Sequence, residues 1–180
     1  MSNQHGGDAS LARRPEQQGL AVSPQSEIAT WKDPDWQRLW LSIEGKAWRA
    51  LALVPAGDGA AVDFTLTIAV ALSRTAMVHL GSPIQVADAT RVPLNQLTPF
   101  LDEVRKVTSA GERLLVALPP TSSGPICTSI AQSADAAILC VLLEKMTATQ
   151  ANHAIRTVGH SRFLGSVIIH PNSSSPVGNV

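Results

Sequence analysis

Five short apolar runs recur along the chain from residue 50 onward, and more polar stretches of helical length separate them. The runs are ALALVPA at 50–56, MVHLGS at 77–82, LLVALPP at 114–120, AAILCVLL at 136–143 and FLGSVIIH at 163–170. Runs without polar alternation are typical of strands that are buried on both faces of a parallel sheet. The pattern therefore predicts five such strands.

Helices are expected between the runs, near residues 60–73, 94–108, 124–133 and 147–158. Repeated strand, helix, strand units form parallel sheets with right-handed crossover connections. The sequence thus predicts an α/β domain with a mostly parallel sheet flanked by helices, over residues 31–171.

A further helix is predicted before the first strand, where Pro34 is suited to the first helical turn. Its apolar residues share one face at helical spacing: Trp36, Leu39, Trp40 and Ile43. Packing of this face on the sheet is one interpretation. The other is a partner-binding or self-association surface built on Trp36 and Trp40, because tryptophan is enriched where interfaces bind most tightly.

The two ends of the chain differ in composition from its middle. Residues 1–28 are rich in Gln, Gly, Ser, Pro and charge, and residues 172–180 are mostly small and polar. Such segments lack apolar groups to offset the entropy of ordering, so both are predicted to be disordered. No window reaches the ~18 apolar residues of a membrane span, and the N-terminus does not resemble a secretion signal. A soluble, cytoplasmic protein is expected.

Charge and cysteine content narrow the possible functions. Lys plus Arg and Asp plus Glu number 14 each, so no basic surplus predicts attraction to nucleic acid or anionic lipid. Cys127 and Cys140 lie in apolar runs and are predicted to be buried thiols. The five histidines form no recognisable metal-ligand set with Cys or carboxylates, so no metal is expected.

The chemistry of an open α/β sheet is expected at the carboxyl ends of its strands. The first run leads into Gly57, Asp58 and Gly59 before an Ala-rich helix, which is the position of a phosphate-binding loop. An ordinary tight turn is the alternative interpretation of these glycines. The third run ends in paired prolines, within the segment Val116–Pro120, and Ser133–Leu139 leads into the fourth.

The order of these motifs resembles the bacterial tyrosine kinases of capsule and exopolysaccharide synthesis, over residues 35–171. More broadly, it is similar to the deviant-Walker P-loop ATPases that include the MinD and ParA families. The resemblance implies that Ala60 and Ala61 occupy the positions of the phosphate-binding Lys and Thr. It also places Gly81 and Pro83 at an Asp-x-Asp pair and Ala117 at a further acid.

A degenerate Walker A loop without its lysine, hydroxyl and metal-side acids is expected not to hydrolyse ATP. The chain also contains no tyrosine, so it cannot phosphorylate itself on tyrosine. No catalytic residue and no cofactor are therefore predicted, and any residual nucleotide contact would fall on Gly57, Asp58 and Gly59.

The resemblance implies a non-catalytic, pseudokinase-like cytoplasmic subunit that regulates or binds a membrane-bound polysaccharide co-polymerase or export protein. Such a subunit could self-associate and could lie at the inner membrane through its partner. Two alternatives stay open. One is an enzyme with an unorthodox phosphate site that takes its charge from Arg74, Arg91 or Lys106, and the other is a MinD- or ParA-like positioning factor.

Overall fold

A computed structural model describes residues 33–58, 60, 63–170 and 176–179. The strands are β1 (Ala50–Pro55), β2 (Gln85–Asp88), β3 (Leu114–Ala117), β4 (Ala136–Leu142), β5 (Phe163–Ile169) and β6 (Pro176–Asn179). The α-helices are α2 (Pro34–Glu44), α3 (Phe64–Leu80), α4 (Leu97–Ser109), α5 (Pro125–Ser133) and α6 (Ala148–Val158). Short 3-10 turns are η1 (Leu94–Gln96), η2 (Thr121–Ser123) and η3 (His160–Arg162).

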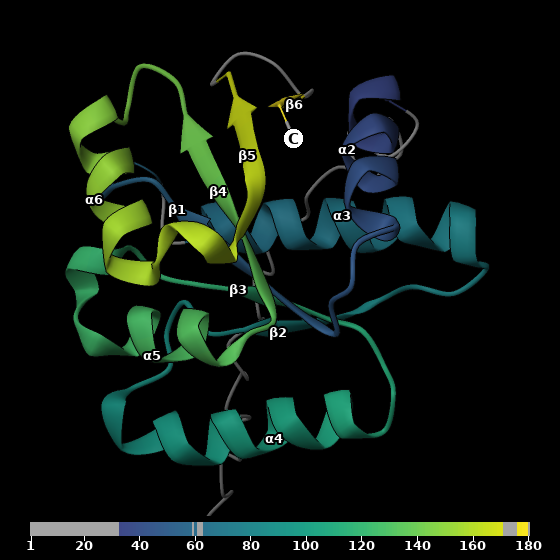
Figure 1. Cartoon of the computed structure of the whole chain (residues 1–180), viewed down its shortest axis with the longest axis horizontal. Helices are drawn as coiled ribbons and strands as arrows, with labels where there is room; N and C mark the ends of the chain where they lie inside the picture. The colour runs from purple at the N-terminus through teal and green to yellow at the C-terminus, as the bar shows by residue number, and fades with distance from the viewer. Residues whose placement is uncertain (1–32, 59, 61–62, 171–175, 180) are drawn as a thin grey trace, which may run out of the picture.

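The strands form one sheet in the order β2-β3-β1-β4-β5-β6. All pairs from β2 to β5 are parallel, and β6 joins β5 in the antiparallel direction. Helices cover both faces, so the predicted α/β architecture with a mostly parallel sheet is confirmed (Figure 1). Because β3 and β4 lie on opposite sides of β1, the chain changes direction around the central strand, which is where open α/β sheets bind ligands.

Strand β1 is buried from end to end and separates two apolar cores. Leu51 and Leu53 pack with residues of α2 and α3 on one face of the sheet. Ala52 and Val54 pack with α4, α5 and α6 on the other face. All four side chains are 0% exposed. This two-sided burial explains why the run at 50–56 is apolar without alternation.

The strand predicted at 77–82 is wrong, because those residues belong largely to α3. That helix runs on to Leu80 and ends at Gly81, whose φ of 74° is the left-handed conformation that commonly closes helices. The second strand is β2, an edge strand of four residues that is exposed at both ends. Its half-exposed sequence QVAD gives no apolar run. The helix expected at 60–73 likewise begins later, at Phe64.

The predicted helix before the first strand is confirmed as α2, but its tryptophans face inward. Trp36 is 4% exposed and Trp40 is 0% exposed. The helix packs against α3 and β6, and the Trp40 ring meets the Trp48 ring edge-on at 6.4 Å between centroids. A partner-binding face made of Trp36 and Trp40 is therefore ruled out in this conformation, since both rings belong to the core.

The C-terminal end also departs from expectation. Residues Pro176–Asn179, predicted to be disordered, form β6 and pair with β5 from Ser166 to Ile169. The predicted disordered tail at 1–28 lies outside the described residues. Within the described ranges, no helix is both long and apolar enough to cross a bilayer.

Both cysteines are buried, as the sequence predicts. Cys127 on α5 and Cys140 on β4 are each 0% exposed. Burial raises the pKa of the Cys127 thiol to about 12, and it raises the pKa of Cys140 as well, because a thiolate would lose its hydration there. Neither thiol is suited to nucleophilic chemistry at neutral pH.

Asp135, in the turn before β4, anchors the start of the central strand. Its Oδ2 accepts the backbone N–H groups of Arg49 and Ala50, each at 2.8 Å. We expect Asp135→Ala to lower the free energy of unfolding by about 1–2 kcal/mol, because two donors at the head of β1 lose a charged acceptor. Urea denaturation measures the change.

Asp135→Asn keeps an acceptor oxygen in the same place and should cost less than the alanine variant. Asp102→Ala is the matched control, since Asp102 forms an exposed ion pair with Arg105 on α4 that should be worth less than about 1 kcal/mol. Equal losses for Asp135→Ala and Asp102→Ala would contradict the anchoring role.

Candidate functional site

A cavity of about 280 Å³ lies at the carboxyl edge of the sheet, beside the end of β1. It is lined by the loop after β1, by η2 after β3 and by the first turns of α6: Ala56, Gly57, Asp58, Thr121, Ser122, Thr149, Gln150 and His153. The cavity therefore occupies the position where an α/β sheet of this order binds its ligand.

Hydrogen bonds tie the loop after β1 to the neighbouring strand ends. The N–H of Ala56 donates to the carbonyl of Cys140 on β4 at 2.8 Å. On the other side, the Ser122 hydroxyl donates to Asp58 Oδ1. The carboxylate of Asp58 is thus directed toward η2 and lines the cavity with a negative charge.

Gln150 on α6 closes over the first glycine of the loop. Its Oε1 accepts the N–H of Thr147 at 2.9 Å, and its own N–H donates to Thr147 Oγ1 at 3.2 Å, which forms a capping box. The same side chain lies against Gly57, where an added Cβ would stand 2.8 Å from Gln150 Cδ. The helix cap therefore holds Gln150 in a position that covers Gly57.

The charges of the cavity do not suit a phosphate group. Among the residues that the structure describes, the lining contains the Asp58 carboxylate and the His153 imidazole but no lysine or arginine. Helix α3, which would present its positive end to a phosphate, starts only at Phe64. Its N-cap residue is Asp63, whose side chain makes no capping hydrogen bond and adds negative charge beside the helix end.

Because the second strand is β2 and not the run at 77–82, its carboxyl end has an acidic residue that was not predicted from the sequence. Gly81 and Pro83 precede β2 and do not stand at its carboxyl end, which is occupied by Asp88. Asp88 Oδ1 accepts the N–H of Thr90 at 2.9 Å and its hydroxyl at 2.6 Å. Asp88 pairs in register with Ala117 of β3, and it does not line the cavity.

The structure thus brings together some of the predicted residues and adds others. Gly57 and Asp58 line the cavity, whereas Gly59 lies outside the described residues. Ser122, Gln150 and His153 were not predicted as members of this site. The Thr147-x-x-Gln150 pattern is a capping-box signal that marks the start of α6, but it does not show that Gln150 reaches β1. Among the described residues, no group of three or more His, Cys, Asp or Glu could hold a metal ion.

Comparisons with known proteins identify the fold and nothing finer. No family model matches the sequence, and no curated protein matches it. Among solved structures, the chimerical protein CapA2B2 is similar with a TM-score of 0.52 and 10% identity, over 84% of this chain and 86% of that one. The BceF tyrosine kinase domain aligns with a TM-score of 0.48 and 13% identity, over 74% and 72% of the two chains. The chain shares the fold of CapA2B2, and at this identity the likeness extends to the fold alone.

Contact between Gly57 and Gln150 can be tested by adding a methyl group to the glycine. We expect Gly57→Ala to lower the free energy of unfolding by about 1–3 kcal/mol, because the new Cβ overlaps a side chain that the helix cap holds in place. Thermal or urea unfolding measures the loss. In a Gln150→Ala background the same substitution should cost less, because the contacts with Cδ at 2.8 Å and Oε1 at 2.9 Å are removed and only that with Cβ at 3.0 Å remains.

Gly45→Ala is the matched control, since nothing lies within 4 Å of an added Cβ at that position. It should change stability by no more than about 0.5 kcal/mol. If Gly57→Ala behaves like Gly45→Ala, Gln150 does not cover the loop.

Proposed function

We propose that this protein is a non-catalytic relative of the bacterial tyrosine kinases of capsule and exopolysaccharide synthesis. It acts as a regulatory or binding subunit in the cytoplasm, next to a membrane-bound polysaccharide co-polymerase or export protein. The observation that carries the proposal is the cavity at the carboxyl edge. It occupies the ligand position of the fold, yet the described residues that line it include no lysine or arginine, and Gln150 covers Gly57.

Electrostatics supports the absence of catalysis. Phosphoryl transfer depends on positioned cations that stabilise charge on the transferred group, and removal of one stabilising group typically costs ~100-fold or more in rate. Here Asp58 lines the cavity and Asp63 occupies the N-cap position of α3, so two carboxylates at this edge oppose a polyphosphate. The motif order described above supports the link to capsule and exopolysaccharide systems.

One observation favours the alternative of an enzyme with an unorthodox phosphate site. Asp88 ends β2 at the same edge of the sheet, and Arg91 follows it in an exposed turn. A carboxylate and a guanidinium are groups that a magnesium nucleotide site would use. Neither residue lines the cavity beside Gly57, so the pseudo-enzyme remains the better-supported proposal.

Calorimetry with ATP and Mg²⁺ separates the two functions. We expect no saturable binding tighter than about 1 mM and no ADP release, because no cation compensates the phosphates. Gln150→Ala should leave this result unchanged, since it uncovers Gly57 without adding positive charge. Saturable binding in the micromolar range, or turnover above a blank without protein, would establish the enzymatic alternative. Loss of that activity in Asp88→Asn would then locate its metal site.

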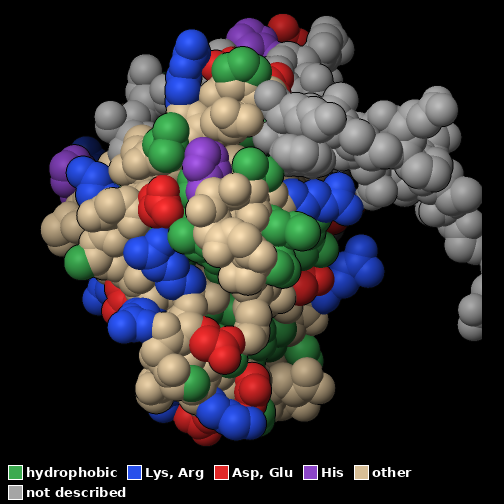
Figure 2. Space-filling model, turned by 90° about the vertical axis from the view of Figure 1, so that its right-hand side faces the viewer, with side chains coloured by type: hydrophobic (Ala, Val, Ile, Leu, Met, Phe, Trp, Pro, Cys, Tyr) green, Lys and Arg blue, Asp and Glu red, His purple; other side chains and the backbone are tan. Residues whose placement is uncertain are grey.

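The partner contact should use exposed apolar residues in place of Trp36 and Trp40. Leu41 on α2 is 56% exposed, and Met77 near the end of α3 is 54% exposed. Helices α2 and α3 pack against each other. Figure 2 shows the molecule from the side where these helices lie in Figure 1, and hydrophobic side chains there are interspersed with charged ones. Non-obligate interfaces are on the whole about as apolar as the rest of a protein surface, so a mixed surface is compatible with such a contact.

A pull-down with the cytoplasmic ends of the co-polymerase encoded in the same gene neighbourhood tests the partner. We expect capture of the wild-type chain and at least tenfold weaker capture of the Leu41→Glu, Met77→Glu variant, because buried charge opposes an apolar contact. Leu94→Glu is the control, since Leu94 is 61% exposed on η1. No capture of the wild type, together with normal polymer export in a deletion strain, would refute the partnership.

A further inference from the structure

A second and larger hollow, of about 510 Å³, lies at the opposite edge of the sheet, where β1, β3 and β4 begin. The connection from α2 to β1 supplies Lys46, Trp48 and Arg49, and Arg113 precedes β3. Asp135, before β4, completes the part of the lining that carries charge. This amino edge is not the position where the fold binds its ligand, and nothing above assigns it a function.

The hollow concentrates positive charge in a protein that is neutral overall. Its lining has three cationic side chains and one carboxylate, which gives a local net charge of three minus one, or +2, whereas the whole chain has a net charge of +0. The single carboxylate, Asp135, already accepts two backbone N–H groups. Among the described residues of the lining, a net charge of +2 therefore remains without a counter-charge.

The Arg113 guanidinium is held in place before any ligand arrives. Its Cζ lies 4.8 Å from the centroid of the Trp48 ring, and its Nη2 donates to the carbonyl of Glu44 at 3.1 Å. Trp48 is itself fixed, because its Nε1 donates to the carbonyl of Ile43 at 2.8 Å. A cation stacked on a fixed indole loses little freedom when it binds an anion.

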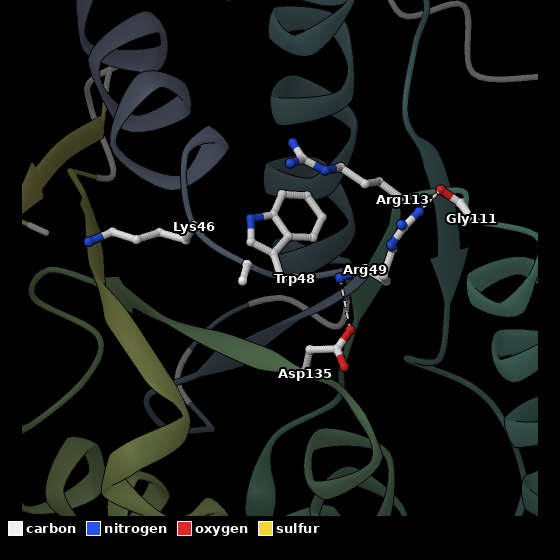
Figure 3. A pocket seen from close by; sticks show the side chains of 7 residues that line it. Lys46, Trp48, Arg49, Gly111, Arg113 and Asp135 are labelled. Carbon is white, nitrogen blue, oxygen red and sulfur yellow. Dashed lines mark hydrogen bonds between the residues drawn. The ribbon is translucent and has the colours of Figure 1, made fainter.

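Arg49 precedes β1, and its guanidinium also donates to a backbone carbonyl, that of Gly111. In Figure 3 it points away from the Arg113 guanidinium, which lies over the Trp48 ring. A guanidinium has five N–H donors, so these carbonyl contacts leave most donors of both arginines available. Lys46 is exposed, and its ammonium group makes no hydrogen bond or ion pair with the described residues. In Figure 3 its ammonium points away from the indole, on a flexible stem that can turn toward a ligand.

The hydrogen bonds to the carbonyls of Gly111 and Glu44 occupy one N–H donor each of Arg49 and Arg113. They do not account for the net positive charge of the hollow. We propose that the amino-edge hollow binds a small molecule through a phosphate monoester group. A phosphate monoester carries about −1.5 to −2 charges at neutral pH, which matches the local +2, and arginine forks bind it through paired hydrogen bonds. The volume lies within the range of small-molecule sites.

Titration with inorganic phosphate, at constant ionic strength set with sodium chloride, tests the site. Calorimetry follows the titration of the full chain. We expect saturable binding with a dissociation constant on the order of 1 mM. Acetate, a single-charge anion, should bind at least fivefold more weakly. The Lys46→Ala, Arg49→Ala double variant should bind phosphate at least tenfold more weakly than the wild type.

The control is Arg105→Ala with Lys106→Ala, which removes the same charge from exposed positions on α4 and should bind phosphate as the wild type does. If the double variant unfolds, Lys46→Ala alone takes its place, with an expected loss of about threefold in phosphate affinity.

Three results would overturn the proposal. They are no saturation by 20 mM phosphate (about twentyfold above the expected dissociation constant), equal weakening of phosphate binding in both double variants, or unchanged binding in Lys46→Ala, Arg49→Ala. None of these results bears on the cavity beside Gly57, so the two proposals fail separately.

Discussion

The burial of β1 on both faces is the constraint on which the rest of the structure depends. Every residue of this strand is buried, so the backbone must find its hydrogen-bond partners in β3 and β4. Helices must then cover both faces of the sheet. This arrangement places the strand ends on two opposite edges, and each edge has its own cavity with its own charge.

The sequence predicted four strands correctly: the central strand β1, its neighbours β3 and β4, and β5 beside β4. β1, β3 and β4 give apolar runs because neighbours on both faces exclude water. β2 gives no such run, because it lies at the edge and is half-exposed. The run at 77–82 is apolar but does not form a strand. Its residues Met77 and Val78 lie on the last turns of α3, where both side chains are more than half exposed. Sequence patterns report hydrophobicity but not which side of a helix meets water.

The candidate site was predictable only in part, for a related reason. Gly57 and Asp58 could be located because a loop that follows a buried strand has a known place in the fold. Gln150 could not, because its contact with Gly57 joins α6 to the loop after β1, and the two segments are far apart in the sequence. Asp88 was missed along with its strand. For Trp36 and Trp40, helical spacing showed that the rings share a face, but it could not show that this face turns inward.

The two edge strands bear on how the protein can assemble with other molecules. β2 and β6 are four residues each, and β2 ends in a carboxylate at Asp88 that is already engaged with Thr90. Such short edges offer little backbone for a foreign strand to join, and the charge at the end of β2 and the proline at the start of β6 add to this protection against edge-to-edge aggregation. Within the described residues, contacts with other molecules are therefore expected to use side chains of the helices and loops in preference to the sheet edges.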